Sequence, residues 1–226
     1  MKILQRYHAT YKYLFKRERL PSLITGFILL SVSFLANHFA FVYAHAYAIR
    51  PTSSYVGDII LDNLPVVDLN PIIVEGMLIA IVVGILYVLS QSRYVLFTMK
   101  TLALFIITRA LFMSLTHIGI YPDHIQPGLG AFDSVYLFFN FQTGLFFSGH
   151  TCVPYFLALI FWEKKTIRYI CFAVSFIFGI SVLVAHVHYS IDVFAAPFMA
   201  YGIFNISKYL FHREYFLIKP EERPSI

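Results

Sequence analysis

Charged side chains are scarce in this sequence of 226 residues. They account for 13% of the chain, whereas hydrophobic residues account for 59%, and the mean hydropathy is +0.72. A soluble domain carries roughly 25% charged residues, so this chain has too few to cover a surface that faces water. The composition therefore excludes an ordinary soluble domain and predicts a membrane protein.

Cysteine is also rare, and the sequence contains no internal repeat and no low-complexity tract. Cys152 and Cys171 each lie alone within an apolar segment. Two isolated cysteines do not make a disulfide framework, and their spacing is not that of metal ligands. We expect both thiols to pack among apolar side chains and the chain to form a single domain.

Long apolar segments take the place of the missing charge. A transmembrane helix needs about 20 apolar residues, and six segments meet this requirement approximately. The fourth is the shortest, and the apolar run Val135–Phe147 before it is either a re-entrant or interfacial helix or an extension of that span. We predict an all-α, polytopic membrane protein with six transmembrane helices: Ser22–Ile49, Pro71–Ser90, Tyr94–Thr116, Ser148–Trp162, Ile167–Ala185 and Ile191–Phe211.

Lysine and arginine residues predict how these helices are oriented. In the predicted topology, all but two of the 17 lie on the side of the membrane that holds the N-terminus, and the exceptions are Arg50 and Arg109. Cytoplasmic loops are enriched in lysine and arginine, so we predict that both termini are cytoplasmic. The anionic inner leaflet then accounts for the net charge of +5, and no nucleic-acid partner is expected.

Three regions follow from this topology. Residues 1–21 form a basic cytoplasmic segment, residues 22–212 form the six-helix transmembrane domain, and residues 213–226 form a cytoplasmic tail that is disordered from Lys219 onward. The first apolar segment is about 28 residues long, which exceeds the apolar core of a signal peptide. We therefore expect it to be retained as the first span.

Polar residues gather at the outer ends of several predicted spans. Ionisable groups at this depth are costly unless they are paired or functional. The residues concerned are Ser148, Gly149 and His150 at the start of the fourth span, His186, His188 and Asp192 between the fifth and sixth, Arg109 in the third and Glu75 in the second.

The spacing of these residues predicts a phosphoryl-transfer site at the outer face. His188 and Asp192 are four residues apart and share one face of a helix if the sixth span begins near His188. The carboxylate can then fix the imidazole tautomer and leave the other nitrogen as a nucleophile or base. His150 comes from another span and can serve as a general acid. Gly149 leaves room at a helix N-terminus, which favours phosphate oxygens, and Arg109 can bind phosphate through two nitrogens.

Each motif also has a simpler explanation. His188 can be a packing histidine and Asp192 a helix cap, and Arg109 can pair with Glu75 or with an outer aspartate. His186 can pack against another helix, join the site, or hold a zinc ion together with His188 and Asp192, although zinc requires three or four ligands.

The quoted motifs resemble those of the sphingomyelin synthase family, a branch of the type 2 phosphatidic acid phosphatase (PAP2) superfamily. Phe147–Thr151 and His186–Val193 resemble its last two motifs, and Arg109–Thr116 is similar to its arginine-containing motif. Gly57–Asp62 is loosely similar to its first motif, and the resemblance covers Tyr55–Tyr209. It implies a PAP2-like helical bundle.

The resemblance also implies roles. His188 would take the phosphorylated head group as a phosphohistidine, Asp192 would orient it, and His150 would protonate the leaving diacylglycerol oxygen and then deprotonate the acceptor. Asp58 and Tyr189 lie within the matching motifs and are further candidates for the site. The partners would be a phospholipid donor and a ceramide or diacylglycerol acceptor, with no cofactor or metal, at the non-cytoplasmic face.

The sequence departs from the broader superfamily in its cationic residues. It lacks the first motif with a lysine and an Arg-Pro pair, and Val182 stands where the phosphatases have an arginine six residues before the nucleophile. These departures favour the synthase branch, because a phosphodiester carries less charge than a phosphomonoester.

Three functions remain open on sequence grounds. The leading one is a lipid phosphotransferase, the second is a lipid phosphatase or phospholipase C-like hydrolase with the same site, and the third is a transporter or scramblase. Homo-oligomerisation is also left open. The outer residues Tyr55, Tyr121 and Tyr136 can form a choline cage or an interfacial aromatic belt.

Overall fold

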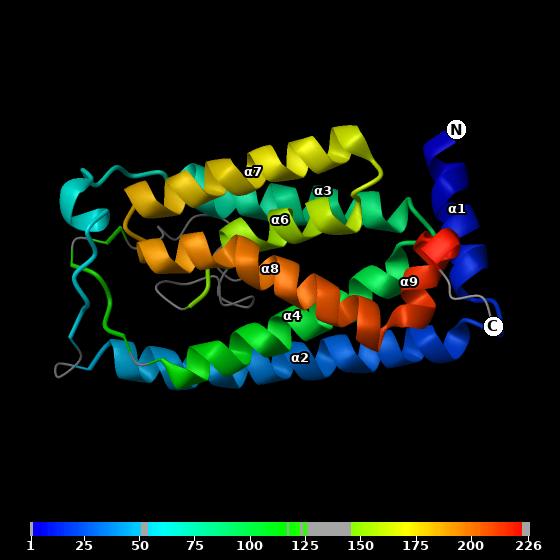
Figure 1. Cartoon of the computed structure of the whole chain (residues 1–226), viewed down its shortest axis with the longest axis horizontal. Coiled ribbons are helices and arrows are strands. Elements are labelled where there is room, and N and C mark those ends of the chain that lie inside the picture. Colours follow the sequence, from blue (N-terminus) through cyan, green and yellow to red (C-terminus); the bar gives the residue numbers. More distant parts are fainter. Residues whose placement is uncertain (1, 51–53, 117, 123, 126–145, 223–226) are drawn as a thin grey trace.

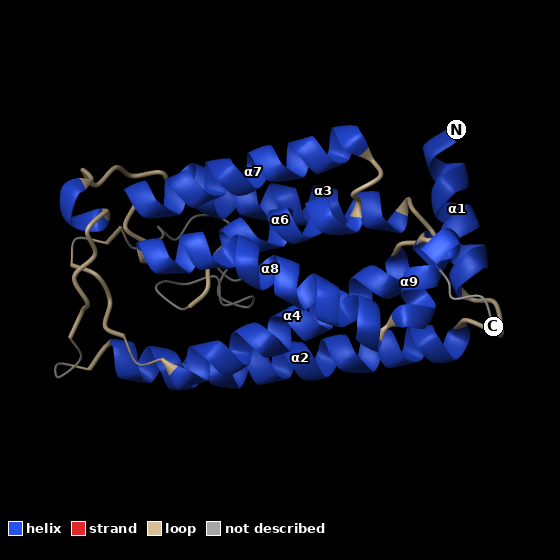
Figure 2. Cartoon of the chain, viewed as in Figure 1, coloured by secondary structure: helices blue, strands red, loops and turns tan. Residues whose placement is uncertain are grey.

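The chain folds as a bundle of helices that run largely side by side (Figure 1). The computed structural model describes residues 2–50, 54–116, 118–122, 124–125 and 146–222. Within these ranges it contains α-helices, short 3₁₀ and π-helical segments and no strand (Figure 2). The all-α prediction is therefore confirmed. Most of the run Val135–Phe147, together with Asp123, Asp133 and Tyr136, lies outside the described residues.

Six helical segments coincide with the six predicted ones and differ from them by no more than two residues at either end. Apolar runs of this length have few alternatives to a helix in a membrane, because every backbone polar group must be satisfied internally. The segments are α2 (Leu20–Ala48), the π-helical η2 (Pro71–Gly76) continued by α3 (Met77–Leu89), α4 (Val95–Leu115), α6 (Gly149–Ile160), α7 (Lys165–Val184) and α8 (Ser190–Leu210).

Four of these segments are long and apolar enough to cross a membrane: α2, residues 71–89, α4 and α7. α6 has 12 residues and rises about 18 Å, which is less than the hydrocarbon thickness of about 30 Å. α8 is long enough, but Asp192 and Asn205 lower its hydropathy. The described helices are thus compatible with a multi-pass membrane protein, and the predicted fifth and sixth crossings stay a prediction.

The outer faces of these helices are apolar, as a lipid environment requires. Large aliphatic and aromatic side chains that are more than half exposed occur on α3, α4, α7 and α8. A water-exposed surface rarely carries so many together. Examples are Ile79, Val83, Leu111, Phe176 and Phe198.

The helices pack in two groups. α2 lies along α4 through small or polar residues that include Gly26, Ser33 and Ala44, and such residues let helix backbones approach closely in membranes (Figure 1). α6 lies against α7 and α8. Gly179 of α7 shows how tight this packing is, because a Cβ there would lie 3.2 Å from Val193 of α8.

The two termini lie at the same end of the bundle, which we call the terminal end (Figure 1). The connection between α7 and α8 lies at the opposite end, the distal end, together with residues 54–70. At the terminal end, α1 (Lys2–Leu14) crosses the bundle within the segment expected to be only a basic extension.

The C-terminal residues are also more ordered than predicted. Residues after α8 form α9 (His212–Ile218), and Pro220–Glu222 form a 3₁₀ turn, so the prediction of disorder from Lys219 is wrong for residues 220–222. Residues 223–226 lie outside the described part. The physical reason is burial: the Glu214 carboxylate accepts hydrogen bonds from Lys100 Nζ (2.6 Å) and from the Ser22 hydroxyl, which ties α9 to α4 and α2.

Candidate active site

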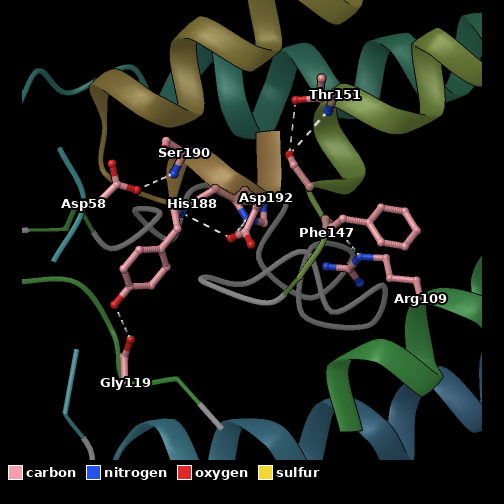
Figure 3. A network of polar contacts seen from close by, with 10 residues as sticks. Asp58, Arg109, Gly119, Phe147, Thr151, His188, Ser190 and Asp192 are labelled. Atoms are coloured by element: carbon pink, nitrogen blue, oxygen red, sulfur yellow. Dashed lines mark hydrogen bonds and ion pairs between the residues drawn. The ribbon is translucent and has the colours of Figure 1, made fainter. Parts of the chain in front are cut away.

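The N-termini of α6 and α8 meet inside the distal half of the bundle (Figures 1 and 3). The Ser148 N–H donates to the Asp192 carbonyl oxygen over 3.1 Å, so the two sequence motifs are joined directly. The imidazole rings of His150 and His188 have centroids 6.0 Å apart and are inclined at 69°. Both histidines are buried, which excludes bulk water from this part of the fold.

His188 and Asp192 form a buried pair at the start of α8. His188 lies two residues before the helix and Asp192 lies in its first turn, so the two do not share a helical face as predicted. His188 Nδ1 lies 3.2 Å from Asp192 Oδ2, and each residue is 2% exposed (Figure 3). The same carboxylate oxygen accepts the Tyr189 N–H over 3.2 Å. The predicted spacing of four residues therefore brings the two side chains together, and Asp192 also caps the helix, which was the simpler explanation. Asp192 Oδ2 therefore both pairs with His188 and caps α8.

The turn before His188 is a helix-capping motif that positions the backbone from which the His188 side chain extends. The Val187 N–H bonds to Val182 O (2.9 Å) and the His186 N–H to Leu183 O (3.0 Å), the paired bonds of a Schellman motif. His186 occupies the left-handed position with φ of 53°, where glycine is usual. This cap ends α7 and turns the chain directly into α8.

His186 itself lies apart from His188. Its ring packs edge-on against Tyr121 with centroids 5.2 Å apart, and it is 4% exposed. Neither of its ring nitrogens has a hydrogen-bond partner among the described residues. The described part of the chain contains no group of three or more histidine, cysteine, aspartate or glutamate side chains placed to hold a metal ion.

Asp58 holds the start of α8 from a different loop. Its Oδ2 accepts the Ser190 N–H over 2.6 Å, and its Oδ1 accepts the N–H groups of Ile60 and Leu61 (Figure 3). Burial opposes ionisation, but these hydrogen bonds outweigh it and lower the pKa of the Asp58 carboxyl. A carboxylate at a helix N-terminus is also favoured by the helix dipole. Asp58 therefore supports the site through the backbone.

Tyr189 points away from Asp192 and ties the distal loops together. Its hydroxyl donates to Gly119 O over 2.8 Å and accepts the Val56 N–H over 3.3 Å. Its ring also packs edge-on against Tyr121, whose hydroxyl donates to Asp62. That hydrogen bond, together with burial and the nearby negative charge, raises the pKa of Tyr121 to about 12. These aromatic rings contact one another, and Tyr136 of the expected cage lies outside the described residues.

The start of α6 is fixed by a serine cap and an arginine. The Ser148 side chain accepts the Thr151 N–H and hydroxyl, as expected of an N-cap residue. Arg109 Nε donates to Phe147 O over 3.1 Å, and a Cβ on Gly149 would lie 3.8 Å from that Nε (Figure 3). Arg109 thus reaches the N-terminus of α6, and no ion pair among the described residues joins it to Glu75.

His150 also lies near η2 through a side chain of α7. Its ring packs edge-on against Phe178 with centroids 6.2 Å apart, and a Cβ on Gly76 of η2 would lie 3.4 Å from the ring of Phe178. π-helical turns widen the helix and recur at functional sites. Glu75 lies in the same turn, with one buried carboxylate oxygen that has no partner among the described residues.

Six predicted side chains or backbone positions therefore converge at the N-termini of α6 and α8. Three others of the predicted set, His186, Tyr189 and Asp58, lie around this centre and face the distal loops. The converging set combines two buried imidazoles, a carboxylate, a guanidinium and a helix N-terminus, which are the groups that phosphoryl transfer uses. It consists of Arg109, Ser148, Gly149, His150, His188 and Asp192.

Residues 143–209 match the family model PAP2 superfamily C-terminal. This match supports membership of the PAP2 superfamily, and it contains α6, α7 and nearly all of α8. Members of that superfamily are generally phosphatase-type enzymes, and the matched residues cover less than half of the chain. Both histidines and Asp192 fall within the matched residues, whereas Arg109 and Asp58 lie outside them. No curated protein matches the chain.

Proposed function

We propose that this protein is a membrane phosphotransferase of the sphingomyelin synthase type, which moves a phosphorylated head group from a glycerophospholipid to a lipid hydroxyl. The observation that carries the proposal is the buried pair His188–Asp192 facing the imidazole of His150. Its placement within a PAP2 match supports it further.

The nucleophile in this proposal is His188 Nε2. Asp192 Oδ2 already accepts the Tyr189 N–H, and an ionised carboxylate can only accept, so His188 Nδ1 must carry the proton that it shares with Asp192. The lone pair then resides on Nε2, the nitrogen that does not face the carboxylate. Attack by Nε2 on phosphorus forms an N–P bond, and the bond from phosphorus to the diacylglycerol oxygen breaks.

His150 serves as the general acid and base. It comes from α6, so its ring approaches the space beside His188 from another helix. In the first half-reaction His150 donates a proton to the leaving diacylglycerol oxygen. In the second it removes the proton from the acceptor hydroxyl, which attacks phosphorus and releases His188. His150 therefore loses its proton in the first half-reaction and regains one from the acceptor in the second, so the complete cycle restores its protonated state.

The negative charge on the phosphoryl oxygens is offset by Arg109 and by the N-terminus of α6. Arg109 lies beside Gly149, where the absent side chain leaves the first turn of α6 accessible. Backbone N–H groups at a helix N-terminus favour phosphate oxygens. A single guanidinium suits a phosphodiester, which carries one negative charge, better than a phosphomonoester with two. This supports a transferase over a phosphatase.

The site is proposed to face the non-cytoplasmic side. It lies in the distal half of the bundle, away from both termini, and lysine and arginine residues are concentrated toward the terminal end. Positive residues favour the cytoplasmic side.

Products formed from labelled phospholipid test the proposal. Purified protein in vesicles is given phospholipid labelled in its head group, with and without ceramide or diacylglycerol. We expect a labelled lipid product that depends on the acceptor and is absent for His188→Ala. Free phosphorylated head group or phosphate in equal amounts with and without acceptor would establish the hydrolase instead. Lipid movement that is unaffected by His188→Ala would establish the transporter or scramblase.

A further inference from the structure

α1 lies across the terminal end of the bundle and is attached to it by one face (Figure 1). The Tyr7 hydroxyl donates to Leu86 O near the end of α3 over 3.1 Å. Thr10 and Leu14 are buried, and Leu14 belongs to the main hydrophobic cluster. These three residues recur at intervals of three and four, so they define a single helical face. The bundle therefore fixes the rotation of α1 about its axis.

A second face of α1 is apolar and uncovered. Leu4, Tyr11 and Phe15 are 76%, 59% and 54% exposed. The rings of Tyr11 and Phe15 have centroids 4.6 Å apart, and the Phe15 N–H donates to Tyr11 O over 3.1 Å, which continues the helical turn one residue past α1. Leu4 lies two turns before Tyr11 on the same side of the helix, and we call these three residues the apolar stripe. A stripe of this kind is unfavourable in water, which indicates that something apolar covers it.

A third face carries exposed positive charge. Lys12 and Lys16 are exposed, as are Arg6 and Arg17, and Glu18 is the single acidic residue of the first 19. Lys12 lies on the side of α1 that points away from the bundle-attached face, and Lys16 follows two residues after α1 ends. The covering partner must therefore be both apolar and anionic at its surface.

Aromatic side chains at the same end of the bundle indicate where the membrane surface lies. Trp162, directly after α6, is 48% exposed, and Tyr169 in the first turns of α7 is 62% exposed. The Arg168 guanidinium lies over both rings. Tryptophan, tyrosine and arginine anchor membrane proteins at the boundary between lipid and water. α1 lies across this end of the bundle, at the level that such residues occupy.

We propose that α1 is an interfacial helix that binds the anionic lipid surface of the leaflet at the terminal end. Its apolar stripe enters the boundary between head groups and acyl chains, about 5–10 Å deep, and its basic face contacts anionic head groups. Each lysine or arginine near such a surface strengthens binding about fivefold. The hydrogen bond from Tyr7 to Leu86 and the burial of Leu14 connect the membrane-bound helix to the bundle.

The experiment compares two label positions on α1 of the full chain. An environment-sensitive fluorophore is attached to His8→Cys, between Leu4 and Tyr11 on the stripe, or to Ala9→Cys on the polar face. The background is Cys171→Ser, and Cys152 is retained because it is fully buried. The protein is reconstituted in phosphatidylcholine vesicles, or in vesicles containing about one third phosphatidylserine, with a quencher carried on the lipid.

We expect strong lipid quenching at position 8, weaker quenching at position 9, and an increase at position 8 when phosphatidylserine is present. The double substitution Lys12→Glu and Lys16→Glu should return quenching at position 8 to its phosphatidylcholine level. The matched control reverses Lys164 and Lys165, which are also exposed at the terminal end but lie outside α1, and should leave the signal unchanged.

Three results would overturn the proposal. Equal quenching at positions 8 and 9 would mean that the stripe does not enter lipid. If quenching at position 8 does not change with phosphatidylserine, or changes equally with both charge reversals, the basic face does not bind anionic lipid. If lipid quenching at position 8 falls as the protein density in the vesicles rises, the stripe is covered by a second copy of this chain. None of these results depends on the catalytic proposal.

Discussion

The N–H of Ser148 donates a hydrogen bond to the carbonyl oxygen of Asp192, and this one bond joins the first residues of α6 to those of α8. Because α6 and α8 both begin at the site, a change at either N-terminus should shift the position of His150 relative to His188.

Replacing Asp192 by asparagine tests the role of its charge. The amide can still accept the Tyr189 N–H, so we expect the fold to persist, but it no longer fixes the His188 tautomer or stabilises positive charge on the ring. The turnover rate should fall at least about 100-fold with little change in Tm, because general-base and orienting groups contribute on this scale. Steady-state kinetics beside thermal unfolding checks this. A variant that loses stability and rate in parallel would indicate that Asp192 is mainly a cap.

Ser148→Ala tests the cap of α6. Removing a serine cap costs about 1 kcal/mol of stability. Thr151 loses its acceptor, and the first turn that carries His150 is loosened. We expect a lower Tm and a moderate loss of turnover rate, both restored by Ser148→Asp or Ser148→Thr. If the cap is irrelevant to the site, alanine and threonine will give the same rate.

Asp58 predicts a specific dependence of stability on pH. Its folded-state pKa is lowered, so its stabilisation is fully present above the unfolded pKa of about 4 and is lost as pH falls through the folded pKa. The Asp58→Asn variant should be less stable than wild type at neutral pH, by about 1–3 kcal/mol for a lost charge-assisted hydrogen bond. Unfolding measured between neutral and acidic pH should show this difference shrinking in acid. A constant difference across that range would contradict the account.

His186 predicts an unusual order of stability among its variants. Alanine and glycine both remove the packing against Tyr121, but only glycine adopts φ of 53° without strain. His186→Gly should therefore be more stable than His186→Ala by about 1 kcal/mol. Comparing the two unfolding midpoints isolates the backbone effect from the lost ring. Equal midpoints would show that the left-handed turn carries no strain.

The buried pair Lys100–Glu214 should behave as a unit. Removing one partner leaves an uncompensated buried charge and costs about 3–5 kcal/mol, whereas replacing both by apolar residues costs much less. Lys100→Met alone should therefore destabilise the protein more than the double variant Lys100→Met, Glu214→Leu. Thermal unfolding of Lys100→Met, Glu214→Leu and the double variant beside the wild type, in detergent or nanodiscs, gives the coupling free energy between the two side chains. Additive effects would mean that the two side chains do not interact.

The helices were predictable to within two residues because apolar runs near 20 residues leave few alternatives in a membrane. α1 and α9 were not predicted, because they are short and carry charge. They are held by contacts between residues far apart in sequence, such as Tyr7–Leu86 for α1 and Lys100–Glu214 for α9. No local pattern encodes such a contact.

The central residues of the site were predictable for a different reason. His188 and Asp192 are only four residues apart at the start of a span, so the short spacing keeps them close even though His188 precedes α8. The supporting contacts were not predictable, because they depend on loops that meet only in the folded chain. Asp58 reaches Ser190 from another loop, and His186 turns toward Tyr121 because its backbone adopts a left-handed conformation.

The most direct test of the central claim is to trap the covalent intermediate on His188. The protein in vesicles is mixed with phospholipid but no acceptor, quenched under alkaline conditions that preserve phosphohistidine, and digested for mass spectrometry. We predict that the peptide containing His188 carries the phosphorylated head group, and that this adduct is absent in His188→Ala and disappears when acceptor lipid is added. Turnover by the wild type without an adduct on His188, or an undiminished rate in His188→Ala, would contradict the account.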